Sequence, residues 1–276
     1  MVNRYLIVNA DDYNTDRERN KGILQSFREG IVTSVSVIAN LPWEEKEIKD
    51  LKKVAGTHVG IHLNLSKGLP LINQGKTLTS TDGQFFIKQK AWRRAMLNMY
   101  DLKEVAMEFS AQINRLKELG FTPDHIDGNN HIHVFPGIAP IVARIAKDYN
   151  IPKIRLPLES FQSWKNYVKQ GAIKKYFIGG LSKSASLVFK AFGLRFPDHF
   201  SGIQFPRVSD MDSIRAFMKN LPEGTNELMC HPGYNNHSDN DFSTGEREQE
   251  LSILTHPAVL DDIRHYNIKL ISYGGL

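Results

Sequence analysis

Two adjacent carboxylates, Asp11 and Asp12, follow directly after an apolar segment near the N-terminus. The segment YLIV at residues 5–8 predicts a buried strand, and burying charge without a partner is costly. Adjacent residues of a regular strand point to opposite faces, so the two acids would not share a direction there. Either the two acids lie on a solvated loop, or a cation lies beside them.

Further polar residues lie in later segments that also predict strands. His62 lies in VGIHLNL, Arg155 in KIRLP and His231 in ELMCHPGY. The segment HIDGNNHIH adds four candidates, namely Asp127, Asn129, His131 and His133. While such a segment stays extended, the spacing D-x-N-x-H-x-H puts alternate side chains on one face. Aspartate and histidine together are typical ligands of a divalent metal ion.

Each of these residues also has a structural explanation when it is taken alone. A single buried histidine such as His62 most often satisfies a core hydrogen bond, Arg155 suits a structural ion pair, and His231 suits a turn. The two adjacent acids could cap the following helix, although Asp16 is the better N-cap candidate. Because five predicted strands each bring such a residue, we favour a metal site. One acid could then bind the metal and the other take a proton from water, while the metal and Arg155 relieve their repulsion.

Strand-like and helix-like segments alternate along the chain. We predict strands at residues 5–9, 33–39, 58–65, 124–128, 153–156, 200–205, 227–230 and 269–272. We predict helices at residues 16–29, 44–54, 102–119, 136–149, 210–220 and 246–266. The alternation predicts an α/β fold, a TIM-barrel-like (β/α) barrel of seven to eight mostly parallel strands. An open doubly wound sheet is the alternative, but no glycine-rich phosphate fingerprint follows any strand.

We predict a single domain spanning residues 1–276, with insertions at about 66–98 and 158–199. Asp82-Gly83 in the first insertion is a strong hairpin turn signal. The second insertion predicts one long helix or two short ones. Insertions of this size either form a lid or substrate wall, or elaborate the packing. Their aromatic residues could stack on a sugar, although such residues are more often core (Phe85, Phe86, Trp92, Trp164 and Tyr167).

Composition narrows the class of protein further. The formal charge is +5 with an isoelectric point near 9.1, and the basic residues are scattered, which argues against nucleic-acid binding. Cys230 is the single cysteine, so neither an intrachain disulfide nor a thiolate metal cluster can form. We recognise no signal peptide and no apolar run long enough to be a transmembrane segment, and therefore expect a cytoplasmic location.

The segments LIVNADDYN, GIVTSVSVIAN, VGIHLNL, HIDGNNHIHVFPGI, RLP and ELMCHPGY together resemble the YdjC-like carbohydrate deacetylases, also called the ChbG/HpnK family. The resemblance runs over most of the chain. It implies a deacetylase that uses one divalent metal ion, zinc or magnesium, on a barrel related to the polysaccharide deacetylase fold. The segment GLRFPDHFSGI at residues 193–203 resembles the hopanoid-biosynthesis branch of the family more than the chitooligosaccharide branch.

The resemblance also implies roles for individual residues. Asp11 corresponds to the catalytic base, Asp12 and His62 to metal ligands, His231 to the general acid, and Arg155 to the residue that orients the base. Substrate-binding or supporting roles are expected for three further residues, Asp127, His133 and Tyr234.

One position departs from the family's usual pattern. The fourth-strand motif usually reads D-x-H-x-H-x-H, and its first histidine is the usual metal ligand, whereas this chain has Asn129 there. Three interpretations stay open. His131 supplies the ring nitrogen from an adjusted backbone, Asn129 binds a harder ion such as magnesium through its carbonyl oxygen, or the metal affinity is low and the activity altered. Among these we favour His131 as the ligand.

The expected reaction is hydrolysis of an N-acetyl group from an amino sugar or glycoconjugate, giving acetate and a free amine. The substrate would be an N-acetylated sugar or a glycolipid. A metal-dependent phosphoesterase is one alternative, and a carbohydrate-binding protein with impaired catalysis is another. The sequence does not fix the oligomeric state, and a homodimer stays open.

Overall fold

The computed structural model describes residues 3–73, 76–159, 172–203, 208, 210–235 and 244–276. Within these residues the strands are β1 (Arg4–Tyr13), β2 (Ser34–Val37), β3 (Val59–Leu63), β4 (Ile126–Gly128), β5 (His199–Ser201), β6 (Gly224–Cys230) and β7 (Ile268–Leu270). The α-helices are α1 (Arg17–Glu29), α2 (Glu45–Ala55), α3 (Lys88–Met96), α4 (Leu102–Glu118), α5 (Ala139–Asp148), α6 (Ala172–Ala191), α7 (Met211–Lys219), α8 (Thr244–Leu254) and α9 (Pro257–His265). Two short 3-10 helices are η1 (Asn129–Val134) and η2 (Tyr273–Gly275).

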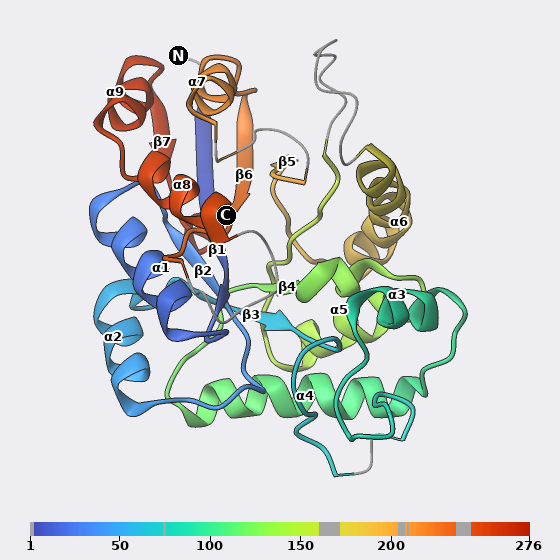
Figure 1. Cartoon of the computed structure of the whole chain (residues 1–276). Coiled ribbons are helices and arrows are strands. Elements are labelled where there is room, and N and C mark those ends of the chain that lie inside the picture. The colour runs from blue at the N-terminus through green and yellow to red at the C-terminus, as the bar shows by residue number, and fades with distance from the viewer. Residues whose placement is uncertain (1–2, 74–75, 160–171, 204–207, 209, 236–243) are drawn as a thin grey trace.

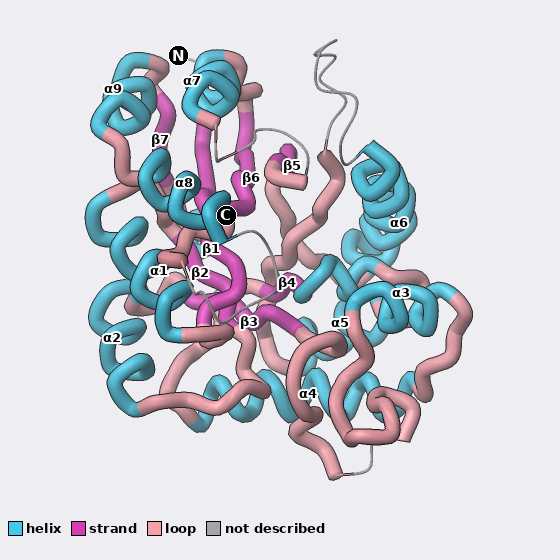
Figure 2. The backbone as a smooth tube through the Cα atoms, in the orientation of Figure 1, coloured by secondary structure: helices cyan, strands magenta, loops and turns pink. Residues whose placement is uncertain are grey.

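The strands form one curled parallel sheet in the order β4-β3-β2-β1-β6-β5. β7 and β2 pair with the same edge of β1. β7 pairs with the first residues of β1, and β2 pairs with the last residues of β1. Isolated bridges from Ile154 to Ile126 and from Glu159 to Phe200 link the two outer strands through residues 154–159. This arrangement confirms the predicted (β/α) barrel class. Figures 1 and 2 show the strands gathered at the centre, with helices outside them.

The strand predicted at residues 153–156 is wrong as a regular strand. Ile154 and Lys153 form only isolated bridges, to β4 and to Arg195. Pro152 and Pro157 flank the segment, and proline offers no N–H to a ladder and restricts the residue before it. Within the described residues seven of the eight predicted strands are therefore observed, although residues 204 and 205 of the predicted 200–205 strand lie outside that part of the chain.

The part of the sheet formed by β2, β3 and β4 is buried on both faces. Every residue of β2, β3 and β4 is buried, which is the usual state of strands in a parallel sheet covered by helices. Helices pack in neighbouring pairs around the outside, α1 on α2, α4 on α5, and α7 on α9. Figure 1 shows α1 and α2 on one side of the sheet and α5 and α6 on the other. Polar side chains inside this sheet must therefore find partners within the protein.

Most predicted helices are confirmed to within a few residues. Asp16 caps α1 as expected, because its carboxylate accepts the backbone N–H of Arg19 at 2.8 Å. The single helix predicted at 246–266 is wrong, because α8 ends at Leu254 and α9 begins at Pro257. Proline disfavours a helical conformation in the residue before it, and here it occupies the first position of a new helix.

The two insertions contain the expected turn and helices. An antiparallel bridge joins Thr79 to Phe85 around the predicted Asp82-Gly83 turn, where Gly83 has φ of 79°. The first insertion also contains α3, which the sequence did not predict, and the second contains α6. Phe85 and Phe86 are buried core residues. Trp164 and Tyr167 lie outside the described residues.

Among the described residues, no helix combines the length and the apolar character needed to cross a lipid bilayer.

Candidate active site

A break in the regular pairing of β1 lets both adjacent acids serve one site. The register between β1 and β2 shifts between Ala10 and Tyr13, and Asp12 has φ of 71°. Such a bulge breaks the strict alternation of side chains and re-aims one of them. Asp11 is consequently buried at the barrel interior, whereas Asp12 is partly exposed, and both line the same pocket.

Arg155 is the cation that the buried acids require. Its Nη1 and Nη2 lie 2.6 and 2.7 Å from the two oxygens of Asp11, a bidentate pair. Nη1 also lies 2.7 Å from Oδ2 of Asp127, and Nε donates to Oε1 of Glu227 at 2.7 Å. All four side chains are nearly inaccessible to solvent. One guanidinium therefore pairs with three carboxylates contributed by β1, β4 and β6.

Asp127 fixes the orientation of His62. Oδ1 of Asp127 lies 2.7 Å from Nδ1 of His62, and Oδ2 accepts the hydroxyl of Ser36 at 2.8 Å. Burial alone would lower the pKa of His62, but the negative charge of Asp127 and this hydrogen bond raise it to about 9. With Nδ1 bound to a carboxylate, the Nε2 atom of His62 is left for the pocket, the arrangement usual for metal-binding histidines.

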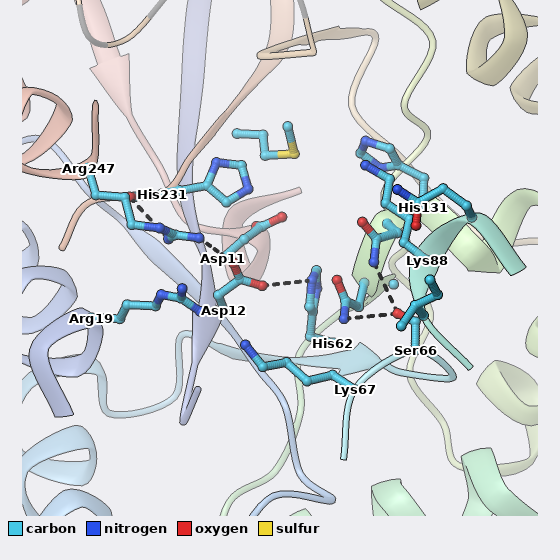
Figure 3. Close-up of a pocket in the computed structure, with 16 residues that line it drawn as sticks. Asp11, Asp12, Arg19, His62, Ser66, Lys67, Lys88, His131, His231 and Arg247 are labelled. Carbon is cyan, nitrogen blue, oxygen red and sulfur yellow. Dashed lines mark hydrogen bonds and ion pairs between the residues drawn. The ribbon is translucent and has the colours of Figure 1, made fainter. Parts of the chain in front are cut away.

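Asp12 lies among positive charges at the pocket wall. Its Oδ2 is 3.0 Å from Nη2 of Arg247, and its Oδ1 is 3.7 Å from Nε2 of His62. Burial would raise the pKa of Asp12, but the charges of Arg247 and His231 outweigh this effect and hold the pKa well below its usual range. Figure 3 shows Asp12 between Arg247 and Arg19 on one side and His62 on the other.

The donor atoms suit a divalent cation. Asp11, His62 and Asp127 offer ligand atoms within 4.8 Å of one another, but Arg155 already takes up the carboxylates of both acids. Oδ1 of Asp12 and Nε2 of His62 are the better pair, since both residues line the pocket and 3.7 Å is too long for a hydrogen bond. Two ligand atoms each about 2.1 Å from one ion lie at most about 4.2 Å apart, so this pair fits a shared cation.

The pocket has a volume of about 540 Å³ and is rich in charge. Its walls come from the ends of β1, β3, β4 and β6 and from the start of α3. Besides the acids and histidines, four basic residues line it, namely Arg19, Lys67, Lys88 and Arg247. A pocket at the carboxyl ends of parallel strands is the usual place for the active site of a (β/α) barrel.

The chain after β4 turns sooner than the sequence pattern suggested. Gly128 is extended, with φ of −157° and ψ of 137°, so Asp127 and Asn129 share a face as predicted. Asn130 and His131 then have positive φ, at 55° and 58°. The expectation that the motif stays extended throughout is therefore wrong. Asparagine tolerates positive φ, whereas glycine at position 128 is required by space, because a Cβ there would lie 2.9 Å from Nδ1 of His133.

Of the predicted site residues around this turn, Asn129 and His131 line the pocket and His133 does not. His133 is fully buried, and its Nε2 lies 3.1 Å from the backbone oxygen of Arg155. Burial lowers the pKa of His133 to about 4, so a neutral ring donates this hydrogen bond. His133 thus supports the backbone that carries Arg155. Tyr234, the other candidate, lines a separate surface hollow beside Gln25.

His231 follows β6 and lies in the pocket beside the two acids. Its backbone N–H donates to Oε2 of Glu250 in α8 at 2.6 Å. Burial raises the pKa of Glu250 to about 7. Figure 3 shows the His231 ring on the same side of the pocket as Asp11. Helix α8 therefore positions a residue at the end of β6.

Sequence reasoning missed the partners that hold these groups in place. Asn9 donates to Asp11 and to Ser36, both at 2.8 Å, and Tyr273 donates to Oε2 of Glu227 at 2.6 Å. Polar residues inside apolar strand segments were the available signal, since Asn9, Ser36 and Glu227 all interrupt such segments. Tyr273 gave no such signal, because its place depends on where the C-terminal turn packs.

The fold and the pocket place this protein in the class of (β/α) barrels, whose enzymes have their active sites at the strand ends. A family model described as YdjC-like protein matches residues 5–265, and the chain belongs to that family. This confirms the resemblance drawn from the sequence motifs, while the hopanoid branch stays a prediction.

Curated relatives match nearly the whole chain. A carbohydrate deacetylase of Danio rerio is 32% identical over 308 residues, covering 97% of this chain and 97% of that protein. A carbohydrate deacetylase of Geobacillus stearothermophilus is 30% identical over 275 residues, covering 98% and 97%. A putative cellobiose-phosphate cleavage protein from Enterococcus faecalis V583 has a similar structure, with a TM-score of 0.80 at 22% identity over 99% of this chain and 98% of that one. That likeness supports the fold alone.

Proposed function

We propose that this chain hydrolyses the N-acetyl group of an amino sugar or glycoconjugate with the help of one divalent metal ion. Deacetylation of a carbohydrate is supported by relatives of that name over nearly the whole chain. The single observation that carries the metal-dependent amide chemistry is the pair formed by Asp12 and His62, backed by Asp127 on the far side of the ring. The same arrangement would suit a metal-dependent phosphoesterase, so the test must separate the two reactions.

Asp12 and His62 would hold the ion in this proposal. A bound divalent ion supplies Lewis acidity, polarising the acetyl carbonyl and making water more acidic. Around it, the charged pocket wall would bind and orient the polar sugar.

Asp11 would take the proton of the attacking water. Among the described residues, Oδ1 of Asp11 accepts from Arg155 and Asn9, whereas Oδ2 accepts from Arg155. A carboxylate oxygen has two lone pairs, so Oδ2 keeps one for the proton. Arg155 holds the carboxylate in a single orientation through its bidentate contact, which is the positioning role expected for it. General-base catalysis of this kind contributes about 10²- to 10⁴-fold to the rate.

His231 would give a proton to the departing amine. An amine is a poor leaving group unless it is protonated, so a general acid must face the scissile bond. His231 lines the pocket, close enough to Asp12 for its charge to lower the pKa of that carboxyl group. Its backbone is held by Glu250, which fixes where the side chain begins.

The direct test is acetate release from short N-acetylglucosamine oligomers and from a panel of other N-acetylated sugars. We expect Asp11→Asn to lower turnover by about 10²- to 10⁴-fold while the protein still binds metal. The matched control is Asp261→Asn, because this exposed acid pairs with Arg264 on the surface and should leave turnover unchanged. Turnover of Asp11→Asn within about tenfold of the unmodified protein would exclude Asp11 as the base. Phosphate release from sugar phosphates without acetate release would favour the phosphoesterase.

A further inference from the structure

The orientation of the Asn129 side chain follows from hydrogen bonds whose donors are known. The backbone N–H of Ser66 donates to Oδ1 of Asn64 at 2.9 Å, and Nδ2 of Asn64 donates to the carbonyl of Lys67 at 2.7 Å. Since a backbone N–H can only donate and a carbonyl can only accept, these two bonds determine which branch of the Asn64 amide is oxygen. Nδ2 of Asn129 lies 3.1 Å from that oxygen, so it is the donor.

The amide oxygen is therefore the atom that Asn129 offers to the pocket. Its nitrogen faces Asn64 and also lies 3.4 Å from the hydroxyl of Ser66. Within the described part of the chain, no hydrogen bond takes up the oxygen of Asn129. The residue lines the same pocket as Asp12 and His62.

Strand register places Asn129 close to the candidate ligands. His62 pairs with Asp127, and the next pair is Leu63 with Gly128, so Asn129 comes one position beyond the paired strands. Because Gly128 is extended, the side chain of Asn129 points to the face that carries Asp127. His131 comes after the backbone has turned, and Figure 3 shows it on the far side of His62 from Asp12.

We propose that Oδ1 of Asn129 is the third protein ligand of the cation and that it makes the site favour hard ions. Asp12, His62 and Asn129 would then supply two oxygens and one nitrogen. Carboxylate and carbonyl oxygens suit magnesium and manganese, whereas imidazole nitrogen suits zinc. This inference rests on the metal dependence in the proposed function, and it replaces His131 by Asn129 as the third ligand.

The experiment measures equilibrium binding of Zn²⁺ and Mn²⁺ to chelator-treated protein by calorimetry, without any substrate. A histidine at position 129 could donate from one ring nitrogen to Asn64 and turn the other toward the pocket. We therefore expect Asn129→His to strengthen Zn²⁺ binding on the order of tenfold and Mn²⁺ binding less, so that the ratio of the two affinities moves toward zinc. Asn129→Ala should weaken Mn²⁺ binding, since it removes the ligand oxygen.

Two variants serve as controls. Asn130→His makes the same substitution one residue along, at a pocket residue whose backbone turns away from the strand direction, and should leave the affinity ratio unchanged. His131→Ala should leave Mn²⁺ affinity near that of the unmodified protein. Circular dichroism of each variant checks that it folds.

Three results would overturn the proposal. The first is no measurable binding of either ion by the unmodified protein. The second is unchanged affinity in Asn129→Ala together with a loss in His131→Ala, which would make His131 the ligand. The third is an equal shift of the affinity ratio in Asn130→His. Because binding is measured without substrate, these results are separate from a failure to release acetate, which would contradict the proposed reaction.

Discussion

At the scale of single residues, the site depends on one buried arginine shared by several acids. Arg155 contacts Asp11, Asp127 and Glu227, which belong to three different strands. Burial and these negative charges act on its pKa in opposite directions, and the charges prevail, holding it well above the usual value. Arg155 therefore keeps its charge inside the barrel, where an unpaired charge would be very costly.

Removing this cation should destabilise the fold strongly. We expect Arg155→Met to lower the free energy of unfolding by about 3–5 kcal/mol, because it leaves buried carboxylates without their partner. The matched control is Arg215→Met, which breaks an ion pair between the half-exposed Arg215 and Asp262 and should cost much less, because solvent screens such a pair. Urea denaturation of the metal-free proteins measures both. Equal losses would show that the buried cluster contributes no more than a surface pair.

Residue types at the strand ends were predictable from the sequence, but their partners were not. The pocket contains Asp11, Asp12, His62 and His231, all of which were candidates. Arg155 and Asp11 are 144 residues apart, and no local pattern reports which distant side chains meet. The partners of a buried acid depend on strand order, which the alternation of elements alone does not determine.

At the scale of elements, the interior of the sheet leaves little room at β3. A Cβ at Gly60 would lie 2.2 Å from Cε1 of His125. The His125 ring cannot easily withdraw, because it stacks on Tyr273 with centroids 3.9 Å apart and contacts Ser36 at 3.1 Å. Ser36 in turn binds Asp127, so packing at this glycine is connected to the orientation of His62.

Two glycine substitutions should therefore change stability in opposite directions. We expect Gly60→Ala to lower the free energy of unfolding by about 1–3 kcal/mol, because the added methyl group overpacks the interior. Gly180→Ala in α6 should raise it by about 0.5–1 kcal/mol, since nothing lies within 4 Å of the new Cβ and alanine favours helix. Urea unfolding curves check both signs. A stable Gly60→Ala protein would mean that His125 can move.

Element boundaries were predictable where local chemistry decides them. Asp16 predicted the start of α1 correctly. Pro257 is a sequence signal for the break between α8 and α9. The turn after β4 is different, because Asn130 and His131 adopt positive φ while η1 packs against β3 and α6. Histidine spacing alone predicted an extended segment there, and tertiary packing decided otherwise.

At the scale of the whole molecule, the ends of the chain meet around one polar core. Tyr273 near the C-terminus binds Glu227 of β6, which binds Arg155, which binds Asp11 of β1. α8 adds Glu250, whose carboxylate holds the backbone of His231. Stability of the whole barrel should therefore respond to the ionisation of buried acids that belong to different parts of the chain.

The raised pKa of Glu250 determines in which direction its contribution to stability changes with pH. Burial raises its pKa from 4.5 to about 7, so the folded chain keeps a proton that the unfolded chain releases between these values. Its contribution to stability is therefore present below about pH 4.5 and is lost as the pH rises toward 7. Glu250→Gln cannot ionise, yet its amide oxygen can still accept the N–H of His231.

We expect Glu250→Gln to match the unmodified protein in unfolding free energy at about pH 4.5 and to exceed it by about 2–3 kcal/mol at pH 8. Urea unfolding of the metal-free proteins at several pH values measures the difference, and the low-pH comparison is the internal control. A difference that does not change with pH would mean that Glu250 keeps an ordinary pKa. A loss of stability at pH 8 would mean that the ionised carboxylate, through His231, strengthens the attachment of α8 to β6.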